Sequence, residues 1–248
     1  MNRTIGFIGG GNMGGAIVGG ILAAQLVTPA SIIVSDLNEE GLARLAKTYG
    51  IKTTTDNVTV AKCADILFLA VKPNVYPAVI DKIKEAVRPE TVVVSIAAGQ
   101  SIEKVEGLFQ TPVKLVRVMP NTPALVGEGM SALSPNSRVT PEETAEISAI
   151  FNSFGKAEIV PESLMDAVVG VSGSSPAYVY LFIEAMADAA VADGMPRAQA
   201  YTFAAQAVLG SAKMVLETGM HPGALKDMVC SPGGTTIEGV AVLEEEGF

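Results

Sequence analysis

The chain has 248 residues, enough for one large domain or two modest ones with a substantial buried core. Its formal net charge of −9 argues against nucleic-acid binding, because proteins that bind nucleic acids are usually basic. Hydrophobic residues make up 49% of the sequence. No stretch of about 18 apolar residues is free of charge, however, so we expect no membrane span.

Strand-like apolar runs alternate with helix-like stretches over the first 160 residues. Strands are expected at 4–8, 32–35, 65–71, 91–96, 114–119 and 129–133, and helices at 13–26, 39–48, 75–87 and 101–109. A further helix is expected to start at Thr140, because Thr140-Pro141-Glu142-Glu143 has the form of a capping box. The last strand is expected at 156–160. Strand–helix alternation predicts parallel pairing in an α/β sheet covered on both faces.

After Pro161 the pattern is helical. Helices are expected at 163–171, 176–192, 197–217, 222–229 and 235–246. The predicted fold is therefore α/β: an N-terminal Rossmann-like, doubly wound sheet at 1–161, followed by an all-α domain at 162–248. The stretch 176–192 is apolar on nearly every side, and a helix of that kind must be buried all round. We therefore expect the second domain to mediate a homodimer, with higher assembly left open.

A glycine-rich loop follows the first strand. Gly9, Gly11 and Gly14 form a G-x-G-x-x-G pattern that opens a helix, the context in which this pattern binds dinucleotides. Gly9, Gly11, Asn12, Met13 and Gly14 are therefore predicted to bind a cofactor through the helix N-terminus. The alternative is a glycine-rich turn without a ligand, which the strand–helix context disfavours.

Asp36 ends the second strand, about 20 residues after Gly14, where an acid is expected to bind ribose. An acid here favours NAD. Ser35 and Asn38 are nevertheless suited to bond a 2′-phosphate, and Asp36 is also placed to cap the helix that begins near Glu39. The choice between NADPH and NADH stays open.

Ligands of doubly wound sheets lie beyond the carboxyl ends of the strands, so residues that directly follow the later strands are further candidates. With Asn57, the remaining predicted cofactor-binding residues are Ala70, Val71, Lys72, Pro73, Ala97, Met119 and Asn121. For Lys72, an ordinary surface lysine is the alternative.

Near the C-terminus, the run Ser231-Pro232-Gly233-Gly234-Thr235-Thr236 interrupts the helical pattern. Its glycines, hydroxyls and following helix start suit a small anion such as a carboxylate. A helix–helix connection capped by Thr235 or Ser231 is the alternative. Two glycines and two threonines exceed what capping needs.

These motifs resemble those of pyrroline-5-carboxylate reductases. The resemblance lies in 227–239, in Val171-Ser172-Gly173-Ser174-Ser175-Pro176-Ala177-Tyr178, in Ala70-Val71-Lys72-Pro73 and in Val118-Met119-Pro120-Asn121-Thr122-Pro123. It spans nearly the whole chain in order. Ser175 departs from the glycine usual in the family. The family generally continues beyond Phe248 with another helix, so whether a tail is missing here stays open.

The resemblance implies reduction of 1-pyrroline-5-carboxylate to L-proline with NADPH or NADH, the last step of proline biosynthesis. It implies that Thr236 is the catalytic hydroxyl beside the imine nitrogen. It also implies that Ser231, Gly233, Gly234 and Thr235, with Thr236, bind the substrate, and that the chains dimerise through the helical domain. A protonated imine is already electrophilic, so no strong acid or base is essential.

Two alternatives stay open at this point. A β-hydroxyacid dehydrogenase shares the glycine loop and a helical second domain. It needs a lysine on the first long helix of that domain, and 173–192 contains none. The second alternative is a nucleotide-binding sensor without turnover.

The cysteine count bears on location and on metal binding. Cys63 and Cys230 have no metal or redox spacing, and two unpaired cysteines fit a reducing, cytoplasmic setting. The N-terminus runs directly into an apolar strand, so no signal peptide is expected. No metal site is predicted.

Overall fold

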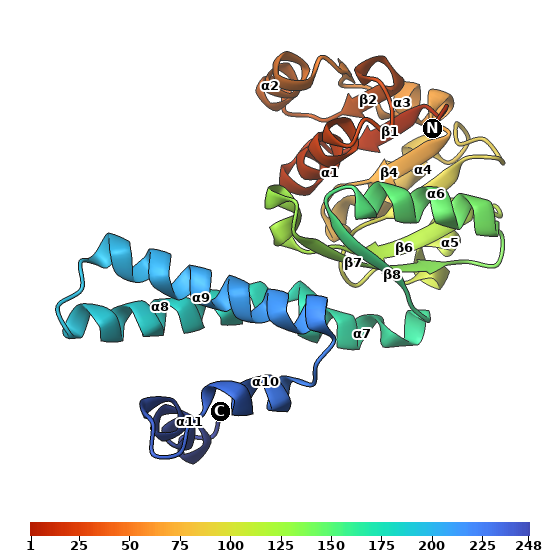
Figure 1. Cartoon of the computed structure of the whole chain (residues 1–248). Helices are drawn as coiled ribbons and strands as arrows, with labels where there is room; N and C mark the ends of the chain where they lie inside the picture. The colour runs from red at the N-terminus through yellow and green to blue at the C-terminus, as the bar shows by residue number, and fades with distance from the viewer. The chain divides into compact units, whose positions relative to one another are not determined.

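The computed structural model describes all 248 residues, and they form two compact units, Met1–Pro176 and Ala177–Phe248 (Figure 1). The α/β class and the helical C-terminal region are as predicted. The predicted boundary near 161 follows the end of the strands, whereas the compact units divide 15 residues later, so the division into 1–161 and 162–248 stays a prediction.

The first unit is built on one eight-stranded sheet in the order β3-β2-β1-β4-β5-β6-β7-β8. The strands are β1 Ile5–Ile8, β2 Ile32–Ser35, β3 Lys52–Thr54, β4 Ile66–Leu69, β5 Val92–Ser95, β6 Lys114–Met119, β7 Gly129–Pro135 and β8 Gly155–Ile159. Every pair is parallel except β6 and β7, which are antiparallel. The order reverses its direction at β1, which is the arrangement that doubly wound sheets use to bind nucleotides.

The antiparallel pair departs from the expected all-parallel sheet. Only a short 3₁₀ turn, Thr122–Val126, separates β6 from β7, and a parallel return needs a crossover of a dozen residues or more. A second difference is the short strand β3 with the helix after it, Asn57–Cys63, neither of which was predicted. β3 has only three residues, none of them buried, so it carries little hydrophobic pattern.

Helices cover both faces of the sheet. They are α1 Asn12–Ala23, α2 Glu39–Tyr49, α3 Asn57–Cys63, α4 Tyr76–Ile83, α5 Ile102–Phe109, α6 Pro141–Asn152 and α7 Met165–Val168. The side chains of α1 and α6 pack on one face, and those of α3, α4 and α5 pack on the other. The predicted capping box at Thr140 is present, with Glu143 reaching back to the Thr140 N–H at 2.9 Å.

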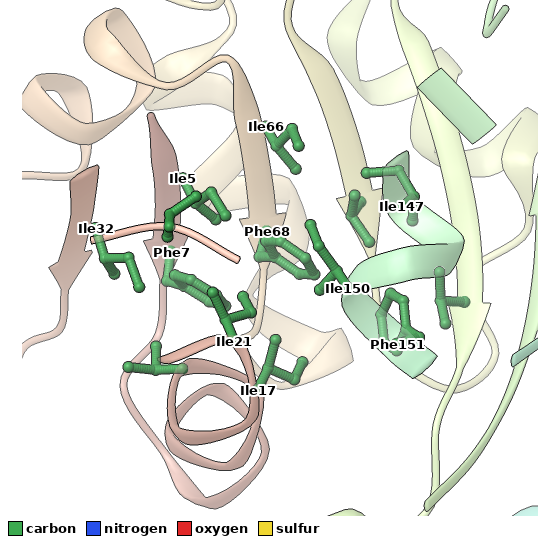
Figure 2. Close-up of a cluster of buried hydrophobic side chains, with 14 of the residues drawn as sticks. Ile5, Phe7, Ile17, Ile21, Ile32, Ile66, Phe68, Ile147, Ile150 and Phe151 are labelled. Atoms are coloured by element: carbon green, nitrogen blue, oxygen red, sulfur yellow. The ribbon is translucent and has the colours of Figure 1, made fainter. Parts of the chain in front are cut away.

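The larger core cluster joins β1 and β4 to α1 and α6 (Figure 2). Phe7 and Phe68 lie opposite each other in the β1–β4 register, and their rings stack with centroids 4.6 Å apart. Ile17, from α1, and Phe151, from α6, complete the cluster as fully buried side chains. Because β1 and α1 both belong to this cluster, their packing fixes the two ends of the loop between them.

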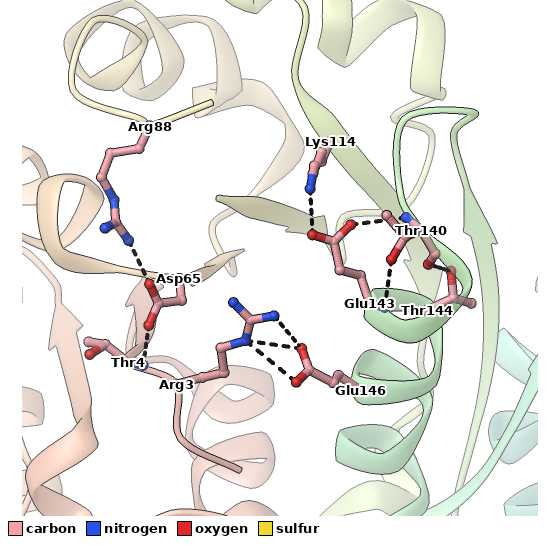
Figure 3. A network of polar contacts seen from close by, with 9 residues as sticks. All are labelled: Arg3, Thr4, Asp65, Arg88, Lys114, Thr140, Glu143, Thr144 and Glu146. Carbon is pink, nitrogen blue, oxygen red and sulfur yellow. Dashed lines mark hydrogen bonds and ion pairs between the residues drawn. The ribbon is translucent and has the colours of Figure 1, made fainter. Parts of the chain in front are cut away.

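Polar contacts hold the N-terminal ends of the strands (Figure 3). Arg3 pairs with Glu146 at 3.0 Å, and Asp65 accepts hydrogen bonds from Thr4 N at 2.8 Å and from Arg88 Nη2 at 2.7 Å. Burial by itself raises the pKa of Asp65, but these hydrogen bonds outweigh it and leave the pKa below its usual value. The network lies at the edge of the sheet opposite the carboxyl ends of the parallel strands.

The helices at and after the boundary are α8 Ser175–Ala192, α9 Arg197–Thr218, α10 Pro222–Val229 and α11 Thr235–Glu245. The expected single helix at 163–171 is instead α7 followed by a π-helical turn, Val169–Gly173. On α8 the apolar side chains are mostly exposed, Leu181 at 67% for example. No helix combines the length and the apolarity needed to cross a bilayer.

Candidate active site

The turn after β1 depends on two glycines that accept no side chain. Gly9 has φ +107°, and a Cβ there would lie 2.4 Å from the Ala70 carbonyl oxygen. A Cβ on Gly14 would lie 2.5 Å from the Gly9 carbonyl oxygen. The Gly9 N–H donates to Ser35 O at 2.8 Å. The chain therefore turns tightly from β1 into α1, as a dinucleotide loop requires.

Gly11 has a different environment. It precedes α1 as its N-cap residue and makes no side-chain cap, and a Cβ built on it meets no atom within 4 Å. Gly11 and Asn12 line a cavity of about 670 Å³. The open space next to the first backbone N–H groups of a helix fits a pyrophosphate, because those groups lack partners within the helix. The residues present therefore fit a bound dinucleotide.

Asp36 belongs to the same cavity. Its Oδ2 accepts the Gly10 N–H at 2.7 Å, and its Oδ1 accepts the Asn38 N–H at 2.9 Å. The N-cap of α2 is Asn38, whose side chain accepts the Gly41 N–H at 3.0 Å. The alternative that Asp36 merely caps α2 is therefore wrong, and its carboxylate instead ties the glycine loop to the end of β2.

Arg44 is a cavity residue to which the sequence pattern assigned no role. It lies on α2 beyond Asp36 and Asn38, is exposed, and forms no ion pair. Arg44 was not predicted from the sequence because the residue lies well beyond the end of β2 in the chain. The helical periodicity of α2 could have identified it, because that periodicity places Arg44 on the cavity wall.

The predicted residues 70–73 directly follow β4, and Ala97 follows β5, the neighbouring strand. Lys72 is exposed and makes no ion pair. Beneath these loops the Tyr76 hydroxyl donates to Leu69 O at 2.8 Å and contacts Ser95 Oγ at 3.1 Å. Tyr76 therefore ties the ends of β4 and β5 together. Its burial raises its pKa to about 12.

Met119 and Asn121 lie at the end of β6 and contact the π-helical turn. Asn121 Nδ2 donates to Ser172 O at 3.0 Å, and its Oδ1 accepts the Met130 N–H at 2.8 Å. A Cβ on Gly173 would lie 2.7 Å from Met119 Cε. The Asn121 amide is thus bonded on both sides to the protein itself, which suits a residue that positions its neighbours.

Two other predicted cofactor-binding residues, Ser35 and Asn57, differ in how deeply their side chains are buried. Ser35 is fully buried, and its hydroxyl donates to Phe7 O at 3.3 Å, so it does not line the cavity. Asn57 is the first residue of α3 after the cap Asp56, and it is half-buried. Because β3 is parallel to β2, Asn57 and Asp36 lie at the same edge of the sheet, beyond the carboxyl ends of these two strands.

In the second unit, the predicted substrate loop lies between α10 and α11. Gly233 has φ +64°, and the Gly234 N–H donates to Ser231 O at 3.0 Å, so 231–234 is a tight turn. Gly234 is the N-cap of α11, with no side-chain cap. Capping by Thr235 or Ser231 is therefore wrong. The hydroxyls of Ser231, Thr235 and Thr236 are exposed and bond to no group of the chain.

The single histidine stands elsewhere in the second unit. His221 is the N-cap of α10, and its Nδ1 accepts the Gly223 N–H at 3.1 Å. This role holds the histidine at a helix start. The chain also contains no group of three or more His, Cys, Asp or Glu residues placed to hold a metal ion.

Two family models match the chain. The model described as pyrroline-5-carboxylate reductase dimerisation matches residues 162–248. The model described as NADP oxidoreductase coenzyme F420-dependent matches residues 4–99. The two matches correspond to the helical region and to the part of the sheet that carries the glycine loop.

Individual relatives match over the whole chain. A pyrroline-5-carboxylate reductase of Escherichia coli is 56% identical over all of this chain and 92% of its own length. A solved pyrroline-5-carboxylate reductase of Coxiella burnetii has a TM-score of 0.93 at 34% identity, covering 99% of this chain and 92% of that one. A Plasmodium falciparum pyrroline carboxylate reductase, solved with NADP bound, has a TM-score of 0.89 at 34% identity, covering 100% and 91%.

Proposed function

Because the chain belongs to the pyrroline-5-carboxylate reductase family, we propose that it reduces 1-pyrroline-5-carboxylate to L-proline with NADPH or NADH. It is an oxidoreductase that acts on a cyclic C=N bond. The observation that carries the assignment of its site is the turn 231–236, where three hydroxyls without intramolecular partners surround an uncapped helix start. That arrangement offers donors to a small carboxylate and a hydroxyl oxygen that accepts the N–H of a protonated imine.

The substrate site divides into two tasks. Ser231, Gly233, Gly234 and Thr235 hold the carboxylate through hydroxyls and backbone N–H groups. Thr236 places its hydroxyl at the imine nitrogen, where it orients the ring and stabilises the polar group during reduction. The reaction adds a hydride to the carbon of the protonated imine, C=NH⁺, and the nitrogen keeps its proton and becomes the neutral secondary amine of the product. The dinucleotide supplies the hydride when bound.

We divide the proposed cofactor-binding residues into four groups. Gly9, Gly11, Asn12, Met13 and Gly14 form the loop and helix start for the pyrophosphate. Ala70, Val71, Lys72, Pro73 and Ala97 form the loops after β4 and β5 that receive the nicotinamide half, while Asp36 and Asn57 lie on the ribose side. Ser35, Met119 and Asn121 support these groups from beneath, because Ser35 and Asn121 already bond to the backbone.

The active form is a homodimer built through the helical region. The exposed apolar side chains of α8 and the match of 162–248 to a dimerisation model support this assembly. Free Cys63 and Cys230 are consistent with a cytoplasmic location, where thiols stay reduced.

The function is tested by following NADH and NADPH oxidation at 340 nm with 1-pyrroline-5-carboxylate. Thr236→Ala is expected to lower kcat by about 10²–10³, the usual cost of one lost hydrogen-bonding group at a reacting centre. Thr236→Ser retains the hydroxyl and should recover most of the rate. Wild-type kcat in the alanine variant would remove Thr236 from the reaction, and tight cofactor binding without any turnover in the wild type would favour a sensor.

A further inference from the structure

Asp36 occupies a particular place in the cofactor cavity. The cavity is lined by the glycine-loop residues Gly10 and Gly11, by Asp36, and by Asn38 and Arg44, and Asp36 bonds both to Gly10 N and to Asn38 N. The pyrophosphate is expected at Gly11, at the start of α1. The next part of a dinucleotide, the ribose that carries the adenine, therefore lies beside Asp36.

The Asp36 carboxylate is held rigidly. One oxygen accepts the Gly10 N–H at 2.7 Å and the other accepts the Asn38 N–H at 2.9 Å. Turning the side chain away would leave two backbone donors without partners, which is costly. Each carboxylate oxygen accepts more than one hydrogen bond, so both oxygens retain capacity for the two neighbouring hydroxyls of a ribose.

A 2′-phosphate meets the opposite conditions at this position. It has acceptor oxygens and negative charge but no donor that matches a carboxylate, and like charges at close range repel. The cavity wall carries one cationic side chain, Arg44, which forms no ion pair with Asp36 or any other acid. A single exposed guanidinium offsets only part of the repulsion among a phosphate dianion and a carboxylate.

We propose that Asp36 makes this enzyme select NADH over NADPH, and that its residual use of NADPH depends on Arg44. The proposal rests on the proposed function, because it assigns the reductant of that reaction.

The test titrates the fluorescence of NADH and of NADPH with the wild type and three variants, and it also measures kcat/KM with each cofactor. Asp36→Asn should weaken NADH binding by about 10- to 100-fold, the size expected for lost hydrogen bonds to a charged acceptor. The same variant should bind NADPH as well as the wild type or better. Arg44→Ala should weaken NADPH binding while NADH binding stays within about 2-fold, a difference too small to alter the preference.

Glu40→Gln is the matched control. It removes one negative charge from the first turn of α2 but does not line the cavity. Its NADH-to-NADPH affinity ratio should equal that of the wild type, and a shifted ratio would assign the preference to the general charge of α2 and overturn the proposal. Damage to the glycine loop in Asp36→Asn would weaken both cofactors equally, which leaves the ratio as the deciding quantity.

A wild type that binds NADPH more tightly than NADH, or an unchanged ratio in Asp36→Asn, would overturn the proposal. The proposed function fails in a different way. In that case NADH binds with the predicted preference in the titration, yet 1-pyrroline-5-carboxylate causes no oxidation at 340 nm. Binding and turnover therefore separate the two conclusions.

Discussion

The two compact units differ in how they bury apolar side chains. Met1–Pro176 encloses two apolar clusters, one on each face of its sheet. In Ala177–Phe248 the only buried residues are three alanines, Ala187, Ala200 and Ala204, while side chains such as Leu181 and Phe203 are each 67% exposed. The first unit is therefore complete by itself, whereas the second needs apolar surface from another chain. Fold and assembly are thus decided in different parts of the sequence.

The largest effect should come from placing a charge on the apolar face of α8. Leu181→Glu buries an unpaired carboxylate in the dimer, which costs roughly 3 kcal/mol or more and raises the dimer dissociation constant at least about 100-fold. Analytical ultracentrifugation should show monomers with little activity. Ala145→Glu, on the exposed side of α6, is the control and should remain dimeric. A dimeric, active Leu181→Glu would contradict the assignment of α8 to the interface.

The next largest effect should be a loss of cofactor binding in the first unit, caused by a side chain at Gly11. Gly11→Val should weaken NADH and NADPH binding on the order of 10²-fold, because the branched side chain occupies the space of the pyrophosphate. Since no protein atom lies within 4 Å of a Cβ at this position, the melting temperature should stay that of the wild type. Cofactor fluorescence titration and thermal melting check the two halves of this expectation. Unchanged affinity in the folded variant would mean that the pyrophosphate lies elsewhere.

Low pH should destabilise the first unit by protonating Asp65. Its folded-state pKa is depressed, so its stabilising contribution is present above the unfolded pKa of about 4 and is lost as the pH falls through the folded value. Asp65→Asn should lower the free energy of unfolding by roughly 1–2 kcal/mol at neutral pH, reduced by partial exposure to solvent. Denaturant unfolding at pH 7 and pH 3 measures it. A variant that loses equal stability at both values would show that the charge is irrelevant.

The smallest effect should come from Tyr76. Because burial raises its pKa to about 12, its neutral form stabilises the fold below the unfolded pKa of about 10, and this contribution is lost as the pH rises toward 12. Tyr76→Phe should cost about 1 kcal/mol at pH 7 through lost hydrogen bonds and should flatten the alkaline loss. Unfolding measured between pH 9 and pH 12 checks both points. An unaltered alkaline profile would place the titration elsewhere.

The sequence alone determined the elements whose patterns are local. β1 and the loop at Gly9, Gly11 and Gly14 follow from apolar runs bounded by glycines, and the start of α6 follows from its capping box. The apolar character of α8 likewise follows from composition along a single helix. The loop at 231–236 was predicted to bind the substrate because it contains more glycines and hydroxyls than a simple connection needs, and that role stays a prediction.

Only the tertiary structure decided what depends on partners distant in the chain. The antiparallel pairing of β6 with β7 is a relation between two segments, so no single stretch of sequence shows its direction. The strand β3 is too short and too polar to show a hydrophobic period. The same holds for single side chains: Asp36 bonds to Gly10, Asn121 bonds to Ser172, and Arg44 reaches the cavity from α2. A residue type limits which bonds a side chain makes, but the fold chooses which partner is within reach.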